Sequence, residues 1–217
     1  MATGHIPHKL EIDVLQVSDV EEAAQLSYKY GFPAMIVHGS IINDALVARG
    51  KIKGKYKIIT PIDWPKGEKS GSLKFRDAVA EIFETDGFEI MLSDEITGHI
   101  NAEVTQIVNF IRTNLGEHID IRFVLGAYTR PNYADICAGL KNCRLPNFLR
   151  LDIPTKGQVT KCNSDTHNQI ISDIDKILSI PIKAAGNINN TTTIKNVNAS
   201  RFAVNLVQAR SIIKEMS

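Results

Sequence analysis

The sequence has little that would bind it to nucleic acid or a membrane. Its 25 Lys and Arg residues are nearly matched by 24 Asp and Glu, giving a formal charge of +1. We therefore expect no nucleic-acid partner, because there is no basic surplus to hold a polyanion. No apolar run reaches the roughly 18 to 20 residues that a membrane helix needs, and the start MATGHIPHKLEID lacks the shape of a signal peptide. The sequence predicts a cytoplasmic protein without a membrane partner.

Metal ligands and disulfides are also poorly represented. The three cysteines, Cys137, Cys143 and Cys162, show no CxxC spacing, so neither a disulfide framework nor a zinc site is encoded. The six histidines show no metal-binding spacing either. We predict reduced thiols, no metal and no cofactor.

What the chain does have is apolar runs of strand length that alternate with segments of helical period, eight times over. No linker rich in glycine or proline interrupts the alternation. Eight parallel strands joined by right-handed crossovers predict a single (β/α)8 TIM barrel, with residues 1–217 as one domain. A doubly wound open sheet is the alternative. The expected strands are 9–17, 33–39, 56–63, 88–94, 120–128, 148–153, 181–188 and 200–206.

Start and stop residues predict the helix boundaries. Asp19 is expected to be the N-cap of a helix that ends at Gly31, and a similar pattern covers 72–87. The segment 101–116 places its apolar residues on one stripe, which predicts a helix packed on the sheet.

Polar residues at strand ends are the candidates for chemistry, because barrel active sites lie at the carboxyl ends of the strands. Side chains alternate along a strand, so Arg150 and Asp152 share a face. If these residues and Lys183 point inward, an ion pair of Arg150 or Lys183 with Asp152 would offset the cost of burying the charges. Arg150 and Asp152 are then either a structural ion pair or catalytic residues. Asp63 is either a proton acceptor at the mouth or a turn cap. Glu89 is interpreted as a solvated or inter-strand paired carboxylate.

Four segments resemble a known family. They are similar, in order and spacing, to the third, fourth, sixth and seventh strand regions of the class I deoxyribose-phosphate aldolases: YKIITPIDWPKG (56–67), FEIMLSD (88–94), FLRLDIPTKG (148–157) and PIKAAGNINNTTTI (181–194). The family's Phe-Pro-x-Gly turn reads Trp64-Pro65-Lys66-Gly67 here, and its Lys-x-Ala-Gly-Gly motif reads Lys183-Ala184-Ala185-Gly186-Asn187. The resemblance implies a TIM barrel and an aldolase-like carbon–carbon lyase of class I type.

The chain departs from the family at two positions that the reaction uses. Arg150 stands where relatives carry the lysine that forms a Schiff base, and a guanidinium cannot form that imine. Met91 stands about where they carry a proton-handling aspartate. Lys183 is then the candidate nucleophile, with Arg150 adjusting its basicity and Asp152 or Asp63 moving protons. The alternative is that Lys183 remains an anion-binding or structural cation.

The resemblance also suggests where a substrate would bind. Gly186, Asn187 and Asn205 correspond to the family's phosphate-binding turns, and Lys156 lies in a polar loop that could hold a phosphate or be merely solvated. We expect a small-molecule substrate, either a small aldehyde or a sugar phosphate, and we expect it to be phosphorylated. The alternatives are an inactive barrel that binds a sugar phosphate or a protein partner, and a different enzyme on the same scaffold. A homo-oligomer is left open.

Overall fold

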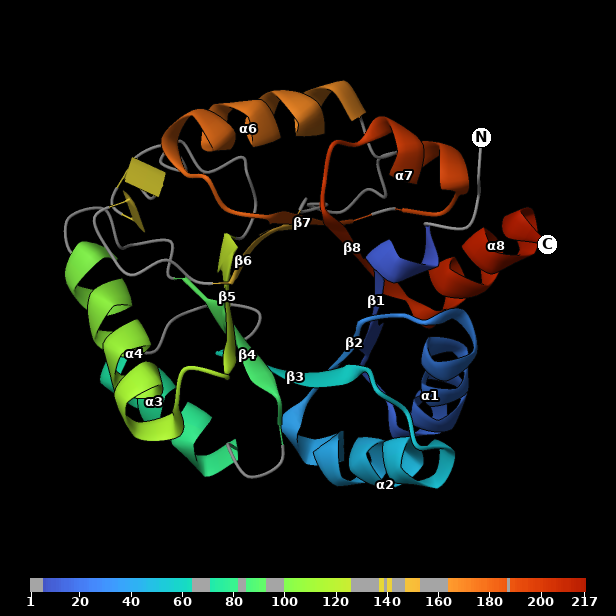
Figure 1. Ribbon diagram of the computed structural model, residues 1–217, viewed down its shortest axis with the longest axis horizontal. Coiled ribbons are helices and arrows are strands. Elements are labelled where there is room, and N and C mark those ends of the chain that lie inside the picture. Colours follow the sequence, from blue (N-terminus) through green and yellow to red (C-terminus); the bar gives the residue numbers. More distant parts are fainter. Residues whose placement is uncertain are drawn as a thin grey trace.

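The strands of the chain close into a barrel (Figure 1). The computed structural model describes residues 6–63, 71–81, 85–92, 100–125, 137–138, 140–141, 147–152, 164–186 and 188–217. All the strand pairs are parallel, each strand pairs with the next, and β8 pairs with β1. The predicted TIM barrel is therefore confirmed. The strands are β1 (Leu10–Val14), β2 (Ala34–Val37), β3 (Lys57–Ile62), β4 (Gly87–Met91), β5 (Asp120–Leu125), β6 (Phe148–Asp152), β7 (Ile182–Ala185) and β8 (Arg201–Asn205).

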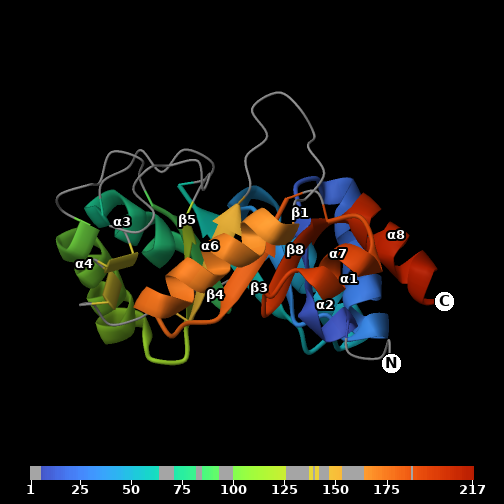
Figure 2. The same cartoon turned by 90° about the horizontal axis from the view of Figure 1, so that it is seen from above.

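Helices surround the barrel, as the two views show (Figures 1 and 2). Short 3-10 turns at Pro7–Lys9 and Gly39–Ile41 precede β1 and the second helix. In the described part of the chain, no helix combines the length and the apolar character needed to cross a membrane. The helices are α1 (Val17–Tyr30), α2 (Ile42–Ile52), α3 (Gly71–Glu81), α4 (Ile100–Leu115), α6 (Ser164–Ile177), α7 (Thr191–Asn196) and α8 (Leu206–Met216).

The start of α1 differs from the prediction, whereas its end agrees. The N-cap is Gln16, and Asp19 lies in the first turn with its N–H bonded to the carbonyl of Gln16. The Asp19 carboxylate there favours the helix through the macrodipole instead of capping it. Gly31 ends the helix in the left-handed conformation, with φ of 72°, as its position in the sequence predicts.

Gly87 does not end a helix, as its place in the 72–87 pattern predicts, but begins β4. A Cβ atom at this position would lie 2.3 Å from the carbonyl oxygen of Asp120 on β5. The glycine is needed for the close approach of two neighbouring strands, and the sequence pattern cannot distinguish that role from a helix stop.

The two faces of the sheet differ in chemistry. Apolar residues such as Ile12, Phe88 and Phe123 face outward and join one large cluster with the helices, including the predicted stripe of α4 at 104–111. On the other face, the apolar cluster consists of Ala34, Ile36 and Ile59 alone among the described residues. The described interior also contains buried charged side chains, and these carry the candidate site.

Candidate active site

Charged side chains from six strands meet inside the barrel. Arg122 on β5 contacts Glu11 on β1, and these two strands are not neighbours in the barrel. A contact between them must cross the interior, which fixes the direction of both side chains. By the same argument, contacts between non-adjacent strands place Asp13, Glu89, Arg150 and Lys183 inside.

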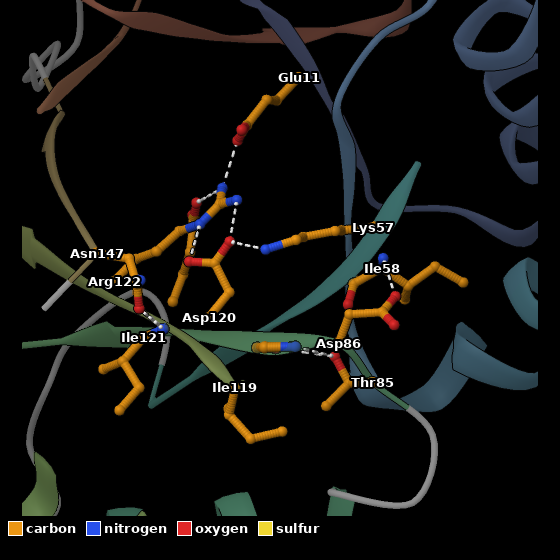
Figure 3. Close-up of polar contacts among 12 residues, drawn as sticks. Glu11, Lys57, Ile58, Thr85, Asp86, Ile119, Asp120, Ile121, Arg122 and Asn147 are labelled. Carbon is orange, nitrogen blue, oxygen red and sulfur yellow. Dashed lines mark hydrogen bonds and ion pairs between the residues drawn. The ribbon is translucent and has the colours of Figure 1, made fainter. Parts of the chain in front are cut away.

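The half of this network nearer the amino ends of the strands is shown in Figure 3. Lys57 Nζ lies 2.9 Å from Asp120 Oδ2. Arg122 donates to both carboxylate oxygens of Asp120, at 3.1 and 3.0 Å, and its Nη1 lies 2.5 Å from Glu11 Oε2. The guanidinium of Arg122 therefore lies between Asp120 and Glu11, and its Nη1 also lies 3.3 Å from Glu89 Oε1.

The half nearer the carboxyl ends continues the alternation. Lys183 Nζ lies 2.9 Å from Glu11 Oε2 and also donates to Glu89 Oε1. Glu89 Oε2 accepts from Arg150 Nη1 at 2.6 Å. Arg150 in turn donates to both oxygens of Asp13, at 2.8 and 3.3 Å. An alternating series of cations and anions thus runs through the barrel, from Lys57 to Asp13.

Burial and pairing shift the pKa values of these groups in opposite directions. Burial alone would raise the pKa of Glu11, but Lys183 and Arg122 outweigh it and lower the pKa to about 2. The pKa of Asp120 is lowered in the same way by Arg122 and Lys57, against its burial. Burial would lower the pKa of Arg122, but the carboxylates of Glu11 and Asp120 raise it. These groups are therefore charged at neutral pH.

A cavity of about 90 Å³ opens where the network reaches the carboxyl ends of the strands. Its lining includes Asp13, Ile36, His38, Pro61 and Arg150. Partial burial, aided by the positive charge of Arg150, lowers the pKa of His38, although Asp13 opposes the shift. At neutral pH the histidine is then largely uncharged, so it can accept a proton.

A larger cavity, of about 460 Å³, lies at the other end of the barrel between segments 27–33 and 53–56. It is bounded by the turns that lead into β2 and β3, and no residue of the charge network lines it. We place the candidate active site at the smaller cavity because that one contains ionisable groups at the carboxyl ends of the strands.

The structure brings together two of the predicted catalytic residues. Arg150 and Lys183 pair in register on β6 and β7, and Glu89 contacts both. Asp152 is the last residue of β6 and pairs in register with Ala185, but its side chain lies outside what is described. Among the described residues, the carboxylates of Asp13, Glu89 and Glu11 contact Arg150 or Lys183, and the pairing with Asp152 stays a prediction.

The remaining predicted residues either have other partners or lie outside the described residues. Asp63 follows β3 with φ of 57°, and its Oδ2 lies 3.6 Å from Nζ of the buried Lys74 on α3. Asn205 caps α8, and the carbonyl of Gly186 accepts a hydrogen bond from Gln208. Asn187 and Lys156, like the turn 64–67, lie outside the described residues.

Sequence reasoning missed Glu11, Asp13 and Arg122, although a signal was present. β1 reads Leu-Glu-Ile-Asp-Val, with a charge at every second position of a strand that a parallel barrel buries on both faces. Of the two interpretations of Glu89, a solvated or a paired carboxylate, the structure shows the paired one. Its partners lie on β5, β6 and β7, and its side chain is fully buried. Among the described residues, no group of three His, Cys, Asp or Glu side chains is arranged to hold a metal.

Known proteins resemble this one in fold. No family model and no curated protein matches the sequence. A deoxyribose phosphate aldolase from Aeropyrum pernix, described as tetrameric, superposes with a TM-score of 0.79 at 12% identity, over 99% of this chain and 92% of that one. A protein from Coccidioides immitis assigned to the same activity gives 0.75 at 14% identity, over 99% and 87% of the two chains.

The structure resembles the deoxyribose-phosphate aldolases. The resemblance noted in the sequence is thus confirmed. An orotidine 5'-monophosphate decarboxylase from Methanocaldococcus jannaschii superposes less well, with a TM-score of 0.62 at 13% identity, over 98% of this chain and 100% of that chain. At these identities the likeness concerns the fold, and the chemistry has to be argued from the site.

Proposed function

We propose that the chain is an aldolase-like carbon–carbon lyase that acts on a small aldehyde or sugar phosphate, with Lys183 as the imine-forming amine. The observation that carries the proposal is the position of Lys183, a fully buried amine inside the barrel that shares Glu89 with the cavity-lining Arg150. The fold shared with solved aldolases supports the same reaction class.

The surroundings of Lys183 supply the proton transfers that an imine requires. Glu89 and Glu11 both contact the amine, and we assign Glu89 as the acceptor of the proton that the ammonium must lose before it attacks a carbonyl, because the low pKa of Glu11 makes it a weak base. The carbinolamine then loses water to give an iminium ion, which accepts the electron pair released when the carbon–carbon bond breaks.

Cleavage also needs a base for the hydroxyl group of the substrate. Asp152 and Asp63 remain the candidates from the sequence. Asp13 and His38 are further candidates, because both line the cavity and the lowered pKa of His38 leaves it able to accept a proton. Arg150 is then a positioning residue that holds Asp13 at the cavity wall.

Trapping the imine tests this assignment. The protein is treated with borohydride in the presence of acetaldehyde, glyceraldehyde or dihydroxyacetone, and the modified peptide is located by mass spectrometry. We expect reduction to label Lys183 in the wild type and in Lys195→Met, a control at an exposed lysine on α7. Lys183→Arg keeps the cation but should give no adduct. An adduct at another lysine, or none with any carbonyl, would contradict the proposal.

A second candidate is a barrel that binds a small molecule without turning it over. It is favoured by the ion pairs of Lys183 with two carboxylates, because a purely structural cation would be held in the same way. In this case aldehydes or sugar phosphates raise the melting temperature, since they bind the folded state, but borohydride leaves no adduct.

Three further properties belong to the same proposal. We infer a cytoplasmic location and no nucleic-acid partner from the composition of the chain. Self-association stays open, and the Aeropyrum pernix neighbour is described as tetrameric. Sedimentation at micromolar concentration would determine the oligomeric state.

A further inference from the structure

The turns after β7 and β8 bear on the nature of the substrate. Loops at this place in barrels frequently bind phosphate, through free N–H groups at the start of a helix. In this chain the start of α8 is closed by its own side chains. Asn205 Oδ1 accepts from the Gln208 N–H and Gln208 Oε1 accepts from the Asn205 N–H, both at 2.9 Å, which is a complete capping box.

The same glutamine also joins the two turns. Gln208 Nε2 donates to the carbonyl oxygen of Gly186 at 3.0 Å, so the turn after β7 is tied to the first turn of α8. A phosphate bound to the N–H groups of Asn205 and Gln208 would have to displace both hydrogen bonds of the capping box. It would also disturb the hydrogen bond from Gln208 to Gly186.

An internal carboxylate lies at the neighbouring turn. Glu215, on α8, accepts from the N–H of Thr191 at 2.8 Å and from its hydroxyl at 3.0 Å. Helices α7 and α8 are neighbours on the outside of the barrel (Figure 1). The first N–H of α7 is therefore already bound to a negative charge, which would repel an incoming phosphate.

Arg150, the cation at the cavity, already forms ion pairs with carboxylates. Arg150 is the cation among the described residues that line the cavity, and it is bound by the carboxylates of Asp13 and Glu89. A phosphate would have to compete with two carboxylates for this guanidinium, whereas a neutral carbonyl or hydroxyl group would not.

We propose that the substrate of this site is a small uncharged hydroxyaldehyde or hydroxyketone, and that the phosphate-binding position of the fold is closed by the Asn205–Gln208 capping box. This inference rests on the proposed function and narrows it, because that function admits both free and phosphorylated aldehydes. It concerns the described residues, and Lys156 stays a separate candidate that the experiment below also tests.

Matched ligands test the inference. We would measure binding by calorimetry and by the NMR chemical shifts of the backbone amides of residues 186 and 205–208. The ligands are glyceraldehyde and glyceraldehyde 3-phosphate, deoxyribose and deoxyribose 5-phosphate, and inorganic phosphate. We expect each free sugar to bind at least as tightly as its phosphorylated partner. Inorganic phosphate should leave these amides unshifted.

A variant without the capping box tests whether the box is what prevents phosphate binding. Asn205→Gly with Gln208→Ala frees the two N–H groups, and glycine is tolerated at an N-cap. We expect this double variant to gain phosphate affinity, by about fivefold, because a helix N-terminus attracts anions. Arg210→Ala, on the same helix but outside the capping box, is the control and should gain none.

The outcomes separate this inference from the proposed function. If phosphorylated ligands bind the wild type about tenfold tighter or more while Lys183 still forms an adduct, the inference is overturned and the lyase assignment stands. A double variant that gains no phosphate affinity also counts against the inference. If no sugar binds and no lysine is modified, the proposed function fails and the substrate class fails with it.

Discussion

Arg122 on β5 reaches across the barrel to Glu11 on β1, with 2.5 Å between Nη1 and Oε2, although the residues are 111 positions apart in the chain. These strands share no backbone ladder, so the two side chains join opposite walls of the sheet. Both are almost fully buried. Two charges removed from water are stable only when each has a partner, and the stability of the barrel should therefore depend on this contact.

Replacing Arg122 with methionine should destabilise the protein strongly. The substitution leaves Glu11 and Asp120 buried without the guanidinium that both contact, and breaking a buried pair costs about 3 to 5 kcal/mol of unfolding free energy. Urea denaturation measures the change. Arg210→Met, which removes the exposed pair with Glu22, is the control and should leave the curve nearly unchanged. Equal effects of the two substitutions would show that the interior charges are not coupled.

Acid should destabilise the protein over a pH range that is set in part by the pKa of Glu11. The pKa of Glu11 is about 2 in the folded protein against about 4.5 for the free side chain, so the unfolded state binds more protons between these values. The stabilisation is complete above about pH 4.5 and is lost as the pH falls towards 2. Urea titrations at several pH values should show a flatter pH dependence for Glu11→Gln than for the wild type. Glu21→Gln, at an exposed carboxylate, should retain the wild-type slope.

The contact between β4 and β5 should not tolerate a side chain at residue 87. A Cβ there would lie 2.3 Å from a backbone oxygen, so Gly87→Ala forces the strands apart and should cost about 1 to 3 kcal/mol. Gly50→Ala is the matched control, because a Cβ at this position of α2 meets nothing within 4 Å. It should stabilise the helix by up to about 1 kcal/mol. Thermal unfolding of the two variants gives the comparison, and a stable Gly87→Ala protein would show that the strands can separate.

Glu89 should control the reactivity of Lys183. It contacts the lysine amine and can accept its proton, so Glu89→Gln should slow borohydride-trapped adduct formation by about 100-fold or more. Glu89→Asp keeps a carboxylate and should recover part of the rate, whereas Glu21→Gln should react like the wild type. The rate is followed by intact mass at several pH values. An unchanged rate in Glu89→Gln would remove Glu89 from the proton transfer.

Much of the fold could be predicted, because it rests on local patterns. The strands fall within their predicted ranges apart from Gly87, and Gly31 ends α1 as its conformational freedom suggests. The boundary errors at Asp19 and Gly87 share a cause. Each residue type suits two local roles, and the choice depends on contacts with other elements, such as the approach of Asp120 to Gly87.

The candidate site was predictable only in part. Alternation along the strand placed Arg150 and Asp152 on one face, but the contacts across the barrel show that Arg150 and Lys183 point inward. Their partners could not be assigned, because Glu11 and Lys183 are 172 residues apart and meet across the barrel. Asn205 was a candidate for anion binding, and the structure shows that it forms a capping box with Gln208, three positions later.

By itself the sequence determined that eight apolar segments would form strands and that charged residues would alternate with apolar ones along several of them, since both follow from local periodicity. Only the closed barrel decided which charges meet. Alternation assigns a side chain to a face, but the tilt and stagger of the strands set its height in the barrel. The pairing of Arg122 with Glu11, and of Glu89 with both Lys183 and Arg150, depends on that height.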